Sequence, residues 1–229
     1  DAIYSFQLAT DSDKADLGIL FDMTEISVQP GQALSLSESG SLGVIISGKG
    51  GLTVTNEGGL TLTNSGNAYH GATTVTGTLT AGASGLGNTS ALIVEGSYIN
   101  SGSNMVGALE VDGSLTLNDT TTLTVTGGAD NTIGSTATVS GKGELELTGG
   151  ELTVQSTAAN TSGFTGTVSV ASGVDLTLET TGSSAGLGAG VIKTVAGADV
   201  QVTGSSASTL TNTVEGAGAL TVTLGNADN

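Results

Sequence analysis

The sequence predicts an all-β fold in which short strands stack as the successive coils of a solenoid. Three observations support this prediction. Short alternating strand patterns recur along the 229 residues. Each pattern ends at a glycine, asparagine or serine, and part of the sequence is repeated. The clearest stretch is residues 48–96, with strand patterns at 52–54, 60–62, 75–79 and 92–94. Such strands are too short to fold alone, so neighbouring coils must bury one another's apolar residues.

The sequence motif at the start of this stretch is repeated twice. The opening at Gly48, GKGGLTV, is repeated as GKGELEL at Gly141, 93 residues later, and as GAGALTV at Gly216. A coil of three short strands uses about 20 to 25 residues, so the chain has room for about ten coils. The 93-residue spacing then corresponds to about four coils.

These repeats resemble the passenger-associated repeat of bacterial autotransporters. The resemblance is strong over about 50 residues and weaker over another 60 or so around the second copy, where Asn160, Phe164 and Gly166 stand near the places of Asn67, Tyr69 and Gly71. It implies a right-handed parallel β-helix exported to the Gram-negative cell surface, with a translocating β-barrel in the full-length protein. The positions that carry the motif are Gly48, Gly50, Leu52, Gly59, Leu60, Asn67, Tyr69, Gly71, Gly141, Gly143, Leu145, Phe164 and Gly166.

Composition sets the kind of core that the chain can build. Aromatic residues make up 3% of the chain and tryptophan is absent, so valine, leucine, isoleucine and alanine must fill the interior. Small aliphatic side chains suit thin stacked layers better than a wide globular core. The 38 glycines fall at strand ends, where they provide turn conformations.

The charge balance excludes several classes of partner. Four lysines, no arginine and 21 acidic residues give a net charge of −17. Nucleic acids and anionic membrane surfaces attract basic proteins, so we expect no nucleic-acid partner, and anionic membrane surfaces are disfavoured. No run approaches the roughly 18 apolar residues of a membrane-spanning helix, and cysteine is absent, so no disulfide holds the fold. The chain begins at Asp1 and ends soon after the third copy of the repeat starts at Gly216, so we expect it to be a fragment.

The strand patterns can be followed along the whole chain. Residues 1–24 are the least repetitive part, and we expect them to form a lead-in or capping segment. This segment is a strand or turn docked on the first coil, or else a short helix that starts near Asp11 and buries Leu17 and Phe21. From residue 25 onward we expect stacked coils, with a turn at Pro30–Gly31. Their strand patterns lie at 26–28, 34–36, 44–46, 109–111, 115–117, 123–125, 174–178, 200–202 and 220–224, with single positions at 139, 145, 152, 168 and 210.

An antiparallel β-sandwich is the alternative fold. Its hairpins need tight two-residue turns, and the chain has no Asn-Gly and one Asp-Gly, at Asp112–Gly113. The loops therefore favour the parallel stack.

No candidate catalytic site is convincing. Residues 182–186, GSSAG, match the nucleophile-elbow pattern but lack its strand, helix and nearby histidine, so they indicate a loop. The single histidine, His70, cannot form a two-histidine metal site and is expected at the surface. Two pairs of acidic residues each flank an inward residue. Glu144 and Glu146 flank Leu145, and Glu110 and Asp112 flank Val111. Paired carboxylates can act as acid and base, but a solvated face explains them equally well.

Two candidate binding sites can also be explained without a ligand. Tyr69 and Phe164 can stack on a sugar or pack on the neighbouring coil, and packing is favoured. Asp11, Asp13 and Asp16 offer oxygen ligands for calcium, but their loop matches no known calcium-binding pattern. We therefore predict no catalytic, cofactor-binding or metal-ligating residue.

The functional expectation is a surface-displayed adhesin or self-association stalk. Outward rows of threonine, serine, asparagine and acidic residues would bind a host glycan, a host protein or another copy of the chain through many weak contacts, the last in an antiparallel arrangement. A scaffold that assists folding and secretion of the passenger is the alternative. A polysaccharide-cleaving β-helix enzyme is a third possibility.

Overall fold

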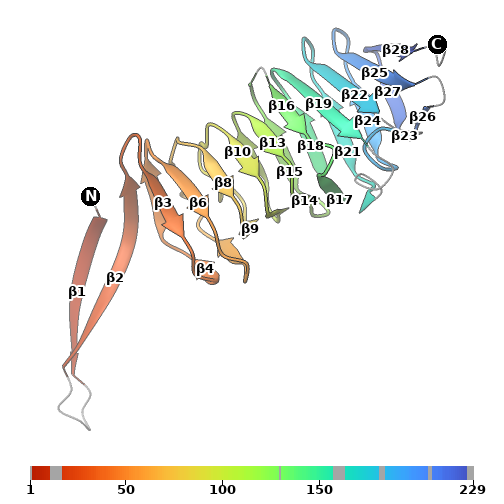
Figure 1. Ribbon diagram of the computed structural model, residues 1–229. Helices are drawn as coiled ribbons and strands as arrows, with labels where there is room; N and C mark the ends of the chain where they lie inside the picture. The colour runs from red at the N-terminus through yellow and green to blue at the C-terminus, as the bar shows by residue number, and fades with distance from the viewer. Residues whose placement is uncertain are drawn as a thin grey trace.

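The computed structural model describes residues 2–10, 17–128, 130–156, 163–180, 184–205 and 208–225. All the regular structure among these residues is β-strand. The strands stack in parallel as an elongated β-solenoid of about nine coils, which Figure 1 shows from the side. The predicted all-β parallel β-helix is therefore confirmed, and the antiparallel sandwich is excluded.

Three long sheets form the sides of the solenoid, and each coil contributes a strand to them in turn. The ten-stranded sheet contains β3 (Ala33–Leu36), β6 (Gly51–Val54), β8 (Thr73–Val75), β10 (Leu92–Val94), β13 (Leu109–Val111), β16 (Asn131–Ile133), β19 (Glu151–Ser156), β22 (Asp175–Thr180), β25 (Asp199–Ser205) and β28 (Ala219–Gly225). The seven-stranded sheet contains β4 (Gly40–Leu42), β7 (Leu60–Leu62), β9 (Thr78–Ala81), β11 (Ser97–Asn100), β14 (Ser114–Leu117), β17 (Thr138–Gly141) and β20 (Gly163–Phe164).

The six-stranded sheet forms the third side. It contains β12 (Asn104–Val106), β15 (Thr122–Val125), β18 (Glu144–Leu147), β21 (Thr167–Val170), β24 (Val191–Thr194) and β27 (Thr213–Gly216). In the first coil this side is β5 (Ile45–Gly48), and in the next two it runs without strands through residues 66–70 and 85–88. Hydrogen bonds still link these segments, since the Ala68 N–H donates to the Ile46 carbonyl over 2.8 Å. A short pair, β23 (Ser184–Ala185) with β26 (Thr209–Leu210), completes the parallel ladders.

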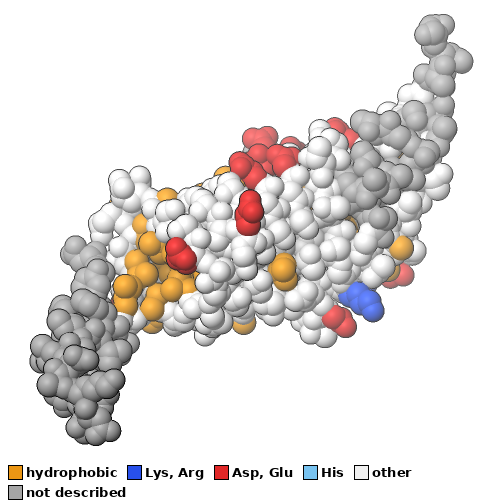
Figure 2. Space-filling view, turned by 60° about the horizontal axis from the view of Figure 1, so that its bottom comes forward, with side chains coloured by type: hydrophobic (Ala, Val, Ile, Leu, Met, Phe, Trp, Pro, Cys, Tyr) orange, Lys and Arg blue, Asp and Glu red, His pale blue; other side chains and the backbone are white. Residues whose placement is uncertain are grey.

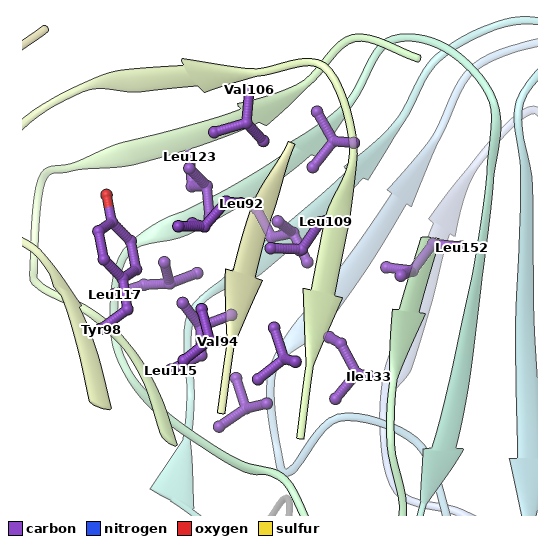
Figure 3. Close-up of a cluster of buried hydrophobic side chains, with 14 of the residues drawn as sticks. Leu92, Val94, Tyr98, Val106, Leu109, Leu115, Leu117, Leu123, Ile133 and Leu152 are labelled. Carbon is purple, nitrogen blue, oxygen red and sulfur yellow. The ribbon is translucent and has the colours of Figure 1, made fainter. Parts of the chain in front are cut away.

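The core is a set of aliphatic rows that run along the solenoid. In the ten-stranded sheet, Leu92 pairs in register with Leu109, and Val94 with Val111. Figure 3 shows this interior, with residues of neighbouring coils lying one behind another. These side chains are fully buried. Each strand alternates inward and outward residues, and the sequence alternation therefore maps directly onto core and surface.

The coils differ in length while the rows stay in register. Register partners lie 17 residues apart between Leu92 and Leu109, and 24 residues apart between Leu152 and Leu176. The expected coil of about 20 to 25 residues is close to these values, although some coils are shorter. Three of the extra residues lie at a corner, since Val106 and Leu109 are three residues apart and their row equivalents Val170 and Leu176 are six apart.

The 93-residue repeat is not a whole number of coils. Gly48 ends β5, on the side of the six-stranded sheet, whereas Gly141 ends β17, in the seven-stranded sheet. The expectation of about four whole coils was therefore wrong, because the same turn chemistry serves two different corners. The opening at Gly216 ends β27 and lies at the same corner as Gly48.

The N-terminal segment is a β-hairpin. β1 (Ala2–Thr10) pairs antiparallel with β2 (Leu17–Val28), and the end of β2 pairs in parallel with β5. Residues 2–10 and 17–24 are strands that pair with each other, and the pairing with β5 is made by residues 25–28, just after the expected lead-in. The helical alternative is wrong for residues 17–21, and residues 11–16 lie outside the described part of the chain.

Candidate binding surface

Rows of outward side chains cover all three sides of the solenoid. Along the middle of the ten-stranded sheet, ten residues follow one another in register, and seven of them carry a hydroxyl group. The row is Ser35, Thr53, Thr74, Ile93, Glu110, Thr132, Thr153, Thr177, Gln201 and Thr221. Hydroxyl groups both donate and accept hydrogen bonds. The surface therefore offers repeated polar contacts at the spacing of the strands, about 4.8 Å.

The repeat-motif residues build corners and core. The backbone conformation is left-handed at Gly48 and Gly141, with φ of 97° and 102°. In each copy the residue after the aromatic position donates a backbone hydrogen bond to this glycine, from His70 to Gly48 over 3.0 Å and from Thr165 to Gly141 over 2.9 Å. The two copies thus share one local geometry. Of the other motif positions, Leu52, Leu60 and Leu145 are buried, Gly50, Gly71, Gly143 and Gly166 allow close contact between coils, and Gly59 has a φ of 89°.

Tyr69 and Phe164 are buried in the core. Tyr69 is fully enclosed, and its hydroxyl lies 2.8 Å from that of Thr73. Tyr98, on the seven-stranded sheet, is also enclosed and donates a hydrogen bond to Asn100 Oδ1 over 2.9 Å. Burial raises the pKa of both tyrosines above the usual value, and their mutual proximity raises that of Tyr98 further. These rings pack between coils and are not accessible for stacking on a sugar.

Buried asparagines join successive coils, a feature that sequence reasoning missed, since it named Asn67 only as a position of the repeat motif. Asn67 Oδ1 accepts from the Ile46 N–H of the coil before over 2.8 Å, and its Nδ2 donates to the Gly85 carbonyl of the coil after over 2.7 Å. Asn131 bridges in the same way to the Leu109 N–H and the Glu151 carbonyl. Oδ1 of Asn104 and Asn212 likewise accepts from the coil before. The available sequence signal is an asparagine in the inward position of a strand pattern, as in Asn104-x-Val106 and Asn131-x-Ile133.

The acidic pairs lie on open faces. Glu144 and Glu146 flank the buried Leu145, as predicted, and both accept hydroxyl hydrogen bonds from neighbouring strands. Glu110 and Asp112 are exposed on either side of the buried Val111. Each pair lies beside polar side chains on a flat sheet. This arrangement fits a solvated face.

Acidic residues also form one column of the ten-stranded sheet. Glu151, Asp175 and Asp199 follow one another in register on β19, β22 and β25. Asp199 Oδ1 is buried and has no hydrogen-bond partner in the protein. Within the described ranges, no group of three or more acidic, histidine or cysteine side chains is placed to hold a metal ion. Asp11, Asp13 and Asp16 lie outside those ranges.

The other candidate residues are not brought together. His70 is exposed at a corner of the second coil, as expected. In the elbow-like stretch, residues 182 and 183 lie outside the described residues, and the next two form the short strand β23. The structure gives this stretch no following helix.

Shallow hollows lie between the corners of neighbouring coils. The Gly-Lys-Gly repeat lines two of them. Lys49 and Gly50 line a hollow of about 330 Å³, and Lys142 and Gly143 line one of about 280 Å³. A third, of about 370 Å³, is lined by serines, asparagines and Met105, a methionine exposed over 57% of its surface. Glycines and apolar side chains line these hollows together with hydroxyl, amide, lysine and carboxylate groups, and the polar groups can make weak contacts.

The comparisons with known proteins add no relative. Among the residues that the structure describes, no helix capable of crossing a membrane is present. No protein-family model, no curated protein and no solved structure matches the chain.

Proposed function

We propose that the chain is a surface-displayed adhesive stalk that binds through its flat outer faces. The observation that carries the proposal is the register of the outward hydroxyl rows, which repeat the same contact once per coil along the solenoid. One hydrogen bond exchanged with water contributes little net free energy. Many such contacts made together give strong attachment through avidity.

The expected ligands are a host glycan, a host protein or another copy of the chain. The net charge of −17 disfavours anionic partners, and the rows of hydroxyl and amide groups suit sugar hydroxyls and similar protein surfaces. The resemblance of residues 48–96 to autotransporter passengers supports display on the outside of a Gram-negative cell. The acidic pairs lie on open faces beside hydroxyl groups, which supports binding as the use of this surface.

Self-association is the version that can be tested with the chain alone. Cells that display the chain should clump and settle faster than cells without it, and the purified chain should scatter more light as its concentration rises. A chain that stays monomeric at high concentration, on cells that remain dispersed, would count against this version. Binding to glycan arrays and to immobilised matrix proteins would then decide between the remaining ligands.

Scaffolding is the second candidate function, and the asparagine bridges between coils favour it. A stack joined in this way can hold a separate functional domain away from the membrane. Deleting residues 52–91, two whole coils from Leu52 to the residue before its row equivalent Leu92, separates the two functions. A scaffold would lose secretion or protease resistance, whereas a purely adhesive face would be displayed normally and lose its binding.

A further inference from the structure

The three sides of the solenoid carry very different charges. The strands of the ten-stranded sheet hold five acidic residues and no basic one, and those of the six-stranded sheet hold three acidic residues and Lys193. The seven strands from β4 to β20 hold no charged residue at all. One side of a strongly acidic molecule therefore has no charged residue in its strands from β4 to β20.

The seven-stranded sheet presents two rows of small, uncharged side chains. Ile99 lies outward on β11, the middle strand of this sheet. The hydroxyls of Thr116 and Ser140, on neighbouring strands, lie 3.0 Å apart. The outward rows are Ser41, Thr61, Thr80, Ile99, Thr116 and Ser140, and Thr78, Ser97, Ser114 and Thr138.

Figure 2 shows the side of the solenoid that carries this sheet. The seven-stranded sheet runs along the lower side of the stack in Figure 1, and Figure 2 turns that side forward. The middle of the face is largely white, the colour of the backbone and of side chains that are neither hydrophobic nor charged, and hydrophobic side chains gather at its left end. Acidic side chains gather along its upper edge, and single acidic side chains lie below that edge. The middle of the face therefore carries few charges.

We propose that a second copy of the chain docks face to face on the seven-stranded sheet. This inference rests on the proposed self-association and names the surface that performs it. Two copies that meet through the ten-stranded sheet would take ten acidic side chains, five from each copy, into one contact, which is unfavourable. The strands of the seven-stranded sheet bring no charged side chain into the contact, and the acidic side chains at its edge stay at the rim (Figure 2).

The same surface is chemically complementary to itself. Threonine and serine hydroxyls can donate or accept, so two identical rows can pair without a change of sequence. The threonine methyl groups and Ile99 add apolar area to the contact. A self-complementary face of this kind produces a two-fold dimer.

The area available predicts weak pairing of single copies. Seven strands of two to four residues, at a spacing of about 4.8 Å, cover roughly 400 Å² on each copy. The total of roughly 800 Å² falls at the low end of weak and transient interfaces. Many copies on one cell surface would therefore be needed for firm attachment, in agreement with an avidity mechanism.

The test uses two isoleucines of the same coil. Ile99 on the seven-stranded sheet and Ile93 on the ten-stranded sheet both face outward and are both half-buried. We expect Ile99→Glu to weaken self-association at least about tenfold in light scattering and to abolish clumping, because it buries like charges against each other. Ile93→Glu should associate as the unchanged chain does. Circular dichroism and the melting temperature should show that both variants remain folded.

A second pair of variants keeps the test independent of Ile99. Thr80→Lys, on the same face, should also weaken association, and Thr74→Lys on the ten-stranded sheet should not. Because the chain has no cysteine, Ile99→Cys and Ile93→Cys each introduce a single thiol. We expect oxidised dimers, seen on a non-reducing gel, from Ile99→Cys and not from Ile93→Cys.

The possible outcomes separate this inference from the proposed function. If the unchanged chain does not associate, both proposals fail together. If it associates, and Ile99→Glu and Thr80→Lys associate equally well while variants of another face do not, the docking face is wrong and self-association stands.

Discussion

At the scale of single residues, Asn67 shows how a polar side chain can hold apolar layers together. It is 7% exposed, and it satisfies a backbone donor in one neighbouring coil and an acceptor in the other. We expect Asn67→Ala to lower the free energy of unfolding by about 1 to 3 kcal/mol, because the buried Ile46 N–H would lose its partner. Urea denaturation followed by circular dichroism measures the change.

Asn56 provides the matched control. It is 6% exposed, but neither its amide nitrogen nor its amide oxygen has a hydrogen-bond partner in the protein. Asn56→Ala should therefore cost clearly less than Asn67→Ala. Equal losses from the two substitutions would show that the bridge contributes nothing beyond the volume of the side chain.

The buried tyrosines predict a limit to stability at high pH. Burial raises the pKa of Tyr69 and Tyr98, so the folded chain holds these protons more tightly than the unfolded chain. Their contribution to stability is complete below the ordinary tyrosine pKa of about 10 and is lost as the pH rises above it. We expect alkaline unfolding above about pH 10.

Tyrosinate absorbance at 295 nm measures this effect, since the chain has three tyrosines and no tryptophan. Ionisation of Tyr69 and Tyr98 should coincide with the loss of the β-sheet signal in circular dichroism. If all three tyrosines titrated near pH 10 while the sheet signal persisted, their burial in solution would be contradicted.

At this scale the sequence predicted the apolar rows well and the polar interior poorly. Leu52, Leu60 and Leu145 could be placed inward because strands alternate with a period of two. That Asn67 lies inside could not be inferred from its polarity, because the partners that satisfy it belong to other coils. Tyr69 and Phe164 could be assigned to packing only through their place in the repeat.

At the scale of elements, the corners depend on glycines that no other residue can replace. Gly141 has a φ of 102°, and an added Cβ would lie 1.9 Å from the Leu117 carbonyl oxygen of the coil before. We expect Gly141→Ala to cost roughly 2 kcal/mol or more, from the backbone strain and the close contact together. Thermal denaturation of the full chain measures this loss.

Gly127→Ala is the control for that substitution. Gly127 lies outside the left-handed region, and an added Cβ would lie 3.5 Å from the nearest atom, an ordinary contact. The substitution should leave the melting temperature almost unchanged. A comparable loss at both positions would mean that the corner geometry is not what constrains Gly141.

The acidic column of the ten-stranded sheet predicts a gain in stability. Glu151, Asp175 and Asp199 lie in register on adjacent strands, where like charges repel. Asp175→Thr should raise the free energy of unfolding by about 0.2 to 1 kcal/mol, and the gain should shrink as salt is added. Urea denaturation at low and high ionic strength measures both effects.

Glu110→Thr is the matched control, because its register partners Ile93 and Thr132 are uncharged. It should show a smaller gain with little dependence on salt. The same gain from both substitutions would indicate a general effect of the net charge rather than the column.

The elements themselves were largely predictable, but their assembly at the corners was not. Short alternating patterns closed by glycine, asparagine or serine gave the strands. The corner that a Gly-x-Gly motif forms depends on how many residues the preceding coils use. Gly48 and Gly141 open the same local sequence, yet they lie at different corners because the coils between them differ in length.

At the scale of the whole molecule, each coil stacks only on its neighbours, so one complete coil should be removable. Deleting residues 73–91 removes β8 and β9 and places Leu92 directly after the coil in which Leu52 is its row equivalent. The shortened chain should remain folded, with a lower melting temperature. Circular dichroism and the cooperativity of melting would show this.

Deleting residues 73–82 alone is the contrasting variant. It removes about half a coil, which shifts the later strands onto the wrong sides and turns apolar residues outward. This variant should fail to fold cooperatively. If both deletions behaved alike, the stacking of coils as independent layers would be contradicted.

The unequal lengths of the coils have one more consequence. Since 17 or 24 residues close the same circuit with the apolar rows still aligned, extra sequence can leave the stack at a corner and rejoin it without disturbing the layers on either side. Corners without a tightly packed glycine can therefore differ in length from coil to coil, and an engineer can graft a foreign epitope there. Surface novelty and structural integrity reside in different parts of each coil.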